Sequence, residues 1–149
     1  MEIFVLRYEN RVKMTPVKVQ SSTATDTAQE NLPRVEPATI EDLPALTELV
    51  MTLFESSGDF APDRATQERG LQLILEQPSR GRIFVVRNEE KIFGMVNLLF
   101  TISTARGGFV ILLEDVVIHP DHRGQGYGKM LLDYVSAFAK KKNFKRITL

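Results

Sequence analysis

The part of this sequence best equipped for chemistry is a run of alternating glycines, Arg123-Gly124-Gln125-Gly126-Tyr127-Gly128-Lys129. Glycines let a backbone approach a ligand closely and leave the amide N–H groups of a loop unobstructed. A helix that starts in such a loop adds partial positive charge at its N-terminus. Arg123 can add a charge-assisted hydrogen bond. The run therefore predicts a site for an anion such as pyrophosphate.

Two common phosphate-binding loops do not fit this run. A Walker loop would need glycine at position 123 and Ser or Thr at position 130, where the sequence has Arg123 and Met130. A dinucleotide fingerprint that starts at Gly124 would need a third glycine at position 129, where Lys129 stands. A nucleotide-binding α/β protein is therefore only a third hypothesis, which predicts saturable ATP or NAD binding.

A strand before the loop and a helix after it must hold the glycines in place. Residues 107–120, GGFVILLEDVVIHP, are apolar at alternating positions on both faces, which is typical of a covered central strand. After the loop, one helical stripe of large side chains predicts a helix packed on the sheet; it consists of Tyr127, Met130, Leu131, Tyr134, Val135 and Phe138.

The rest of the sequence predicts an α/β fold with a mixed sheet. We expect a strand at 32–37, a helix from Leu43 through Phe54, and a second helix that begins near Pro62 and ends before Pro78. Strands at 82–87 and 91–102 are joined by a turn, and 144–149 is a last strand. The predicted order is β-α-α-β-β-β-α-β.

The sequence divides into two parts. Residues 15–31 are polar and rich in Ser and Thr, without an apolar period, so we expect residues 1–31 to be a flexible polar arm. The folded domain is predicted to span residues 32–149.

Composition excludes several classes of protein. The 149 residues are 43% hydrophobic, which is ordinary for a soluble domain, and 19 basic residues balance 19 acidic ones. We therefore expect no nucleic acid or membrane partner. The chain has no cysteine and two histidines, so we expect no metal site and no thiol nucleophile. With no signal sequence and no apolar run long enough to span a bilayer, a cytoplasmic location is expected.

The loop matches the Arg/Gln-x-x-Gly-x-Gly/Ala signature of the GNAT superfamily of acyl-CoA-dependent N-acetyltransferases. The resemblance continues through EDVVIHPDHRGQGYGKMLL, and more loosely to VEPATIEDLPALTELV near the start of the predicted domain. It implies a mixed, mostly antiparallel sheet flanked by helices, with acetyl-CoA as the acyl-donor substrate and no metal.

The resemblance also implies roles for particular residues. The backbone amides of Arg123, Gly124, Gln125, Gly126, Tyr127, Gly128 and Lys129 would hold the CoA pyrophosphate. Main-chain groups of Val116, Val117 and Ile118 would pair with the pantetheine arm like an added strand. The N–H of Val116 or Val117 would stabilise the tetrahedral oxyanion.

Acetylation of an amine also needs a proton acceptor, because only the neutral amine attacks a thioester. Glu114 is the predicted catalytic base, since it lies two residues before Val116 in an otherwise apolar run and relatives often keep an acid there. Strand alternation would point its neighbour Asp115 to the opposite face.

Relatives continue past this last strand with a further helix and two strands, a region that supplies their usual tyrosine general acid. We therefore expect a domain that is incomplete at its C-terminus, and we name no general acid. An uncovered last strand exposes an edge, which would favour a homo-oligomer.

The main hypothesis is direct acetyl transfer from acetyl-CoA to a primary amine, either a small molecule or a peptide, in a ternary complex. The acceptor would bind near the first two helices, where Glu55, Asp59 and Asp63 could attract a cation. The alternative is a non-catalytic acyl-CoA-binding module or a truncated, inactive relative.

Overall fold

The computed structural model describes residues 3–4, 31–57 and 61–149. It contains the predicted elements in the predicted order. The strands are β2 (Arg34–Pro37), β3 (Gly81–Arg87), β4 (Ile92–Ser103), β5 (Gly108–Ile118) and β6 (Ile147–Thr148); the helices are α1 (Leu43–Ser57), α2 (Arg64–Glu76) and α3 (Tyr127–Lys141). Short 3-10 turns precede α1 (Ile40–Asp42) and α3 (Pro120–His122).

One additional strand lies within the predicted arm. Residues Ile3–Phe4 form β1, which pairs in parallel with β6. Sequence periodicity could not reveal a strand of this length. Residues 1–2 and 5–30 of the predicted flexible arm lie outside the described residues.

The sheet has the order β1-β6-β5-β4-β3-β2. Strands β2 through β5 are antiparallel to their neighbours, whereas β5 pairs with β6 in parallel. The pairing between β5 and β6 covers only two positions, Ile111 with Ile147 and Leu112 with Thr148. The sheet is thus mixed and mostly antiparallel, which confirms the predicted fold class.

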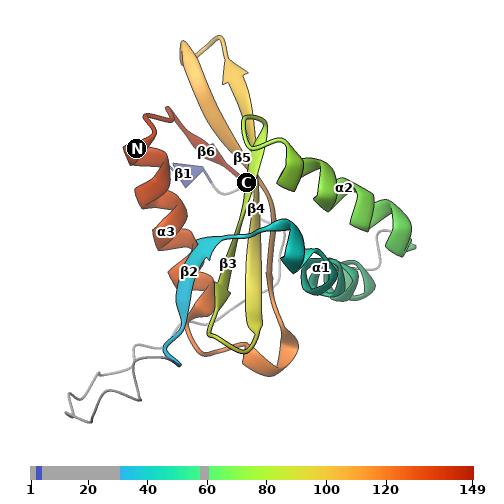
Figure 1. Ribbon diagram of the computed structural model, residues 1–149. Helices are drawn as coiled ribbons and strands as arrows, with labels where there is room; N and C mark the ends of the chain where they lie inside the picture. Colours follow the sequence, from blue (N-terminus) through green and yellow to red (C-terminus); the bar gives the residue numbers. More distant parts are fainter. Residues whose placement is uncertain (1–2, 5–30, 58–60) are drawn as a thin grey trace, which may run out of the picture.

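Helices cover both faces of the sheet (Figure 1). Helices α1 and α2 pack on one face, where Leu46, Leu49 and Val50 bury the side chains of Met95 and Val117. Helix α3 packs on the other face, where Leu131, Val135 and Ala139 are fully or almost fully buried. The stripe predicted for α3 therefore faces the core.

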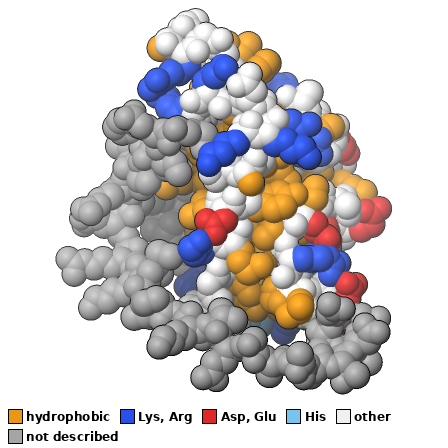
Figure 2. Space-filling model, turned by 90° about the vertical axis from the view of Figure 1, so that its left-hand side faces the viewer, with side chains coloured by type: hydrophobic (Ala, Val, Ile, Leu, Met, Phe, Trp, Pro, Cys, Tyr) orange, Lys and Arg blue, Asp and Glu red, His pale blue; other side chains and the backbone are white. Residues whose placement is uncertain are grey.

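Charges are distributed unevenly over the α3 face (Figure 2). Lys and Arg side chains gather toward the end where α3 finishes and the β4–β5 hairpin projects, whereas acidic side chains are visible mainly farther from that end, beside other Lys and Arg side chains. Hydrophobic side chains are visible between them.

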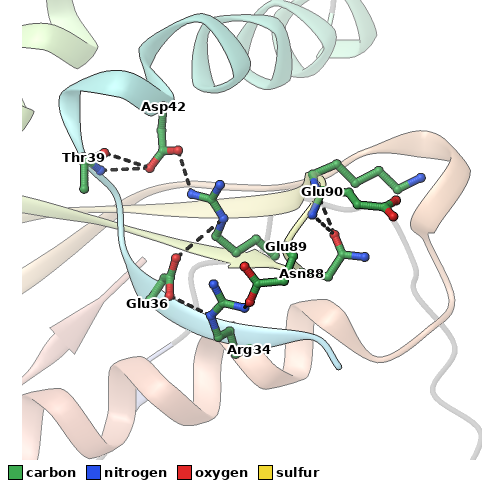
Figure 3. A network of polar contacts seen from close by, with 9 residues as sticks. Arg34, Glu36, Thr39, Asp42, Asn88, Glu89 and Glu90 are labelled. Carbon is green, nitrogen blue, oxygen red and sulfur yellow. Dashed lines mark hydrogen bonds and ion pairs between the residues drawn. The ribbon is translucent and has the colours of Figure 1, made fainter. Parts of the chain in front are cut away.

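A polar network fixes the start of α1 to the edge of the sheet (Figure 3). Asp42, which is 8% exposed, accepts hydrogen bonds from the Thr39 backbone N–H (2.9 Å) and from Nη1 of Arg87 on β3 (2.7 Å). The Arg87 guanidinium also lies beside Glu36 on β2. Thr39 and Asp42 therefore form a capping pair, and Asp42 additionally anchors α1 across the sheet.

Among the described residues, no helix is long and apolar enough to cross a membrane.

Candidate active site

The glycine loop lies at the carboxyl end of β5 and runs into the N-terminus of α3. Gly124 and Gly126 have φ values of 76° and 86°, a left-handed conformation that favours glycine. Met130 N donates to Gly126 O at 3.1 Å, so it is the first amide that the helix itself satisfies. The amides of Tyr127, Gly128 and Lys129 precede it, and Gly126 provides no side-chain cap for them. The loop and helix start thus offer N–H donors to an anion.

Side chains of the loop are held by the surrounding protein. Nε of Arg123 donates to Ile118 O at 3.1 Å, which keeps its guanidinium at the end of β5. The Tyr127 ring stacks on Phe93 with 4.8 Å between centroids. The Lys129 ammonium pairs with Asp133 on α3. Lys129 therefore contributes its backbone N–H to the loop, while its side chain lies along the helix.

The second part of the site is the edge of β5 beyond Leu112. There, no described strand pairs with β5 on the side of β6. His119 N donates to Phe93 O on β4, whereas Ile118 O accepts from Arg123 instead of from β4. Because the direction of main-chain groups alternates along a strand, the N–H groups of Val116 and Ile118 face the open edge.

Val117 differs from its two neighbours. Its main-chain groups point toward β4, and its side chain is 3% exposed in the core beneath α1. Of the two oxyanion donors expected from the sequence, the geometry therefore favours Val116.

A β-bulge interrupts β5 at Glu114. Asn97 on β4 pairs with Asp115, and the next residue, Leu98, pairs with Leu113, so Glu114 is the extra residue. Its side chain is exposed and makes no hydrogen bond or ion pair with any described residue. The strand alternation used to assign faces to Glu114 and Asp115 does not continue through this bulge.

Asp115 lies on the α1–α2 face of the sheet. Its position follows from the register, since Met95 pairs with Val117 and Asn97 pairs with Asp115 two residues along each strand. Nδ2 of Asn97 donates to Oδ2 of Asp115 at 3.2 Å. Burial raises the pKa of the Asp115 carboxyl, and the hydrogen bond from Asn97 opposes this only in part.

The three acidic residues expected to attract an acceptor have different surroundings. Asp63 is the N-cap of α2; its carboxylate accepts hydrogen bonds from the hydroxyl and backbone N–H of Thr66, and the hydroxyl bond lowers its pKa. Glu55 is exposed on α1. Asp59 lies outside the described residues.

No group of three or more His, Asp or Glu side chains in the described part of the chain could hold a metal ion. The features present suit an extended ligand with a diphosphate instead. The glycine amides can bind the charged end, and the free N–H groups of Val116 and Ile118 can bind an amide-containing arm.

Comparison with known proteins agrees with this geometry. Residues 43–149 match the family described as acetyltransferase (GNAT). The chain belongs to the GNAT acetyltransferase family. This match covers helices α1 and α2, the bulged strand β5 and the glycine loop.

Solved structures share the GNAT fold. An integron cassette protein from the mobile metagenome of Cole Harbour Salt Marsh is 25% identical, with a TM-score of 0.72, covering 76% of this chain and 74% of its own. A possible acetyltransferase from Clostridium difficile 630 is 18% identical, with a TM-score of 0.74 and coverages of 79% and 78%. An aminoglycoside acetyltransferase from an uncultured soil metagenomic sample, in complex with sisomicin, is 23% identical, with a TM-score of 0.63 and coverages of 83% and 80%. No curated protein matches the chain.

Sequence reasoning missed Asn97 as a residue of the site. The signal was present, because Asn97 is the polar residue within the apolar run Ile92–Phe100. Its partner could not be found without the register of β4 against β5.

Proposed function

We propose that this GNAT-family chain is an N-acetyltransferase that transfers the acetyl group of acetyl-CoA directly to a primary amine within a ternary complex. The observation that carries the proposal is the continuity between the open edge of β5 and the amide-rich start of α3. One elongated ligand can bind to both, with its diphosphate at the loop and its pantetheine along the strand.

In this proposal, the amides of residues 124–129 bind the CoA pyrophosphate; the N–H of Arg123 already donates to Pro120 O, and its guanidinium at the end of β5 adds a cation. Main-chain groups of Val116 and Ile118 pair with the pantetheine arm. The Val116 N–H then polarises the thioester carbonyl and stabilises the oxyanion. Loss of a comparable donor costs about 3 kcal/mol in other enzymes, which is the contribution expected here.

The acceptor must lose protons as it reacts. An alkylamine has a pKa near ~10.4, so at neutral pH most of it is ammonium. Glu114, exposed at the bulge, takes one proton through water. The nitrogen lone pair forms the bond to the acetyl carbon, the C–S bond breaks, and the sulfur leaves with the second proton as CoA thiol. The acceptor in this proposal is a small-molecule or peptide amine.

Direct transfer is supported by the residues present. The chain contains no cysteine, and no described Ser or Thr at the open edge has an adjacent base.

The reaction is tested by incubating the full chain with acetyl-CoA and a panel of primary amines that includes n-butylamine and a lysine-containing peptide. We expect thiol and the N-acetylated amine to appear in equal amounts. Acetyl-CoA binding without thiol release would contradict catalysis and support the alternative of a non-catalytic acyl-CoA-binding module.

A further inference from the structure

The pair Asn97–Asp115 contains hydrogen-bond acceptors that the protein leaves without donors. Asn97 is 5% exposed, and its Oδ1 atom is buried with no hydrogen-bond partner among the described residues. Asp115 accepts one hydrogen bond, from Nδ2 of Asn97, and no other described group donates to it. Buried acceptors without donors are unfavourable and rare in folded proteins. A site of this kind suits a ligand that brings N–H donors.

The pair also lacks a positive charge. Asp115 forms no ion pair with any described residue. Helix α1, which packs against β4 and β5 on the same face, contains no Lys or Arg in its sequence LPALTELVMTLFESS. Burial raises the pKa of Asp115, which is the result of desolvation without a compensating cation. A half-buried carboxylate of this kind is stabilised when a ligand supplies the charge.

A primary ammonium group meets both requirements. It carries a positive charge and three N–H donors, enough for the free acceptor positions of the half-buried Asp115 carboxylate, which Asn97 holds in place through its Nδ2. A hydroxyl acceptor would offer one donor and no charge, and a quaternary ammonium group would offer charge without donors.

The pair lies beside the proposed oxyanion donor. Asp115 directly precedes Val116, whose N–H faces the open edge of β5, and its side chain lies on the α1–α2 face. We infer that Asn97 and Asp115 form the subsite that binds the primary ammonium group of the acceptor. This inference rests on the proposed acetyl transfer, and it assigns substrate binding to Asp115 while Glu114 takes the proton.

The Asp115→Asn variant keeps the shape of the side chain and its acceptor for Asn97. The folded state binds the Asp115 proton more tightly than the unfolded chain, so the stability that this group contributes falls as pH rises through its raised pKa. At neutral pH the ionised carboxylate therefore opposes folding. We expect the Tm of Asp115→Asn in the absence of ligand to be no lower than that of the parent, so this variant should fold.

The subsite is tested by following the Asn97 side-chain NH2 signals by NMR while the free chain is titrated with n-butylammonium chloride. The matched probe is n-butyltrimethylammonium chloride at the same ionic strength, which has the charge without the donors. We expect saturable shifts with the first salt and about tenfold weaker binding of the second. Asp115→Asn should weaken n-butylammonium binding about tenfold or more. The control variant Glu90→Gln, which changes an exposed residue in the turn between β3 and β4, should bind n-butylammonium normally.

Steady-state kinetics gives a second readout. Asp115→Asn should raise the KM for n-butylamine about tenfold, with kcat and the Kd for acetyl-CoA changed by less than about threefold. Unshifted Asn97 signals, equal responses to the two salts, or unchanged affinity in Asp115→Asn would overturn the inference. The titration needs no acetyl-CoA, so a chain that fails to bind acetyl-CoA would contradict the proposed function and leave this test intact.

Discussion

Glu114 and Asp115 are neighbours in the sequence, but the bulge in β5 gives them different surroundings. Glu114 is the extra residue and is exposed, whereas Asp115 is half-buried beside Asn97. An exposed carboxylate can exchange protons with water, and a desolvated one binds a cation more strongly. This difference in burial is the reason why we propose proton transfer for Glu114 and ammonium binding for Asp115.

Removal of the Glu114 carboxylate tests its role as the base. Glu114→Gln should lower kcat at neutral pH about 100-fold, because a positioned general base contributes on this order. The rate of the variant should then rise with pH toward the amine pKa of ~10.4, as the neutral amine becomes abundant. The measurement is the pH profile of thiol release with n-butylamine, with Glu90→Gln as the control. An unaltered kcat would remove Glu114 from the mechanism.

The chemistry-bearing residues were predictable from sequence to different degrees. The glycine loop could be found because its alternating glycines stand between a strand pattern and a helix pattern. The left-handed conformation of Gly124 and Gly126 explains why glycine is needed there. The Asn97–Asp115 pair could not, because it depends on the cross-strand register. The bulge at Glu114 could not be predicted from the two-residue period of a strand either, because that period assumes an uninterrupted strand.

At the scale of elements, the position of α1 on the sheet face that carries Asn97 and Asp115 depends on a contact with β3. Arg87 and Asp42 join β3 to the start of α1 through a largely buried ion pair. The predicted helices, β3, β4 and β5 agree closely with the structure because each has a clear apolar period. Strand β6 is shorter than the predicted 144–149: Asn143 has a φ of 59°, and Lys145 N already donates to Phe109 O, so regular pairing begins only at Ile147.

Loss of the Asp42 charge should weaken this anchor. Asp42→Asn should lower the free energy of unfolding by about 1–3 kcal/mol, because it leaves the partly buried Arg87 with only the longer ion pair to Glu36. The matched control is Glu89→Gln, which removes an exposed ion pair with Arg34 and should cost less than about 1 kcal/mol. Urea denaturation of both variants measures the difference. Equal effects would show that the anchor contributes no more than a surface pair.

At the scale of the whole molecule, the net charge is zero, but the basic and acidic residues are distributed unevenly. Residues 77–82, 103–110 and 139–149 contain no acidic residue and carry Arg80, Arg82, Arg106, Lys140, Lys141, Lys142, Lys145 and Arg146. Strand β5 spans roughly 35 Å between the β4–β5 hairpin and the glycine loop. The basic cluster is therefore too far from the loop to contact an anion bound there.

The edge of the sheet beyond β6 also belongs to this scale. The sequence predicts an exposed strand there, whereas β1 pairs with Ile147 and Thr148 in the structure. Composition and periodicity describe neighbours along the chain, so they could not predict a pairing between residues 3–4 and the last strand. That pairing covers one short part of the edge, and it leaves β5 open from Glu114 to Ile118 on the side of the proposed ligand.

The most direct test of the account is a calorimetric titration of the full chain with acetyl-CoA, with ATP as the control ligand. Gly126→Ala should weaken acetyl-CoA binding, because a side chain at φ 86° strains the loop by about 1–2 kcal/mol. Gly107→Ala, at φ 62° in the distant β4–β5 hairpin, carries similar strain and should bind normally. We expect saturable binding of acetyl-CoA, none of ATP, and a loss of acetyl-CoA binding in Gly126→Ala alone. A folded chain that binds no acetyl-CoA, or that binds ATP equally well, would contradict the proposed function.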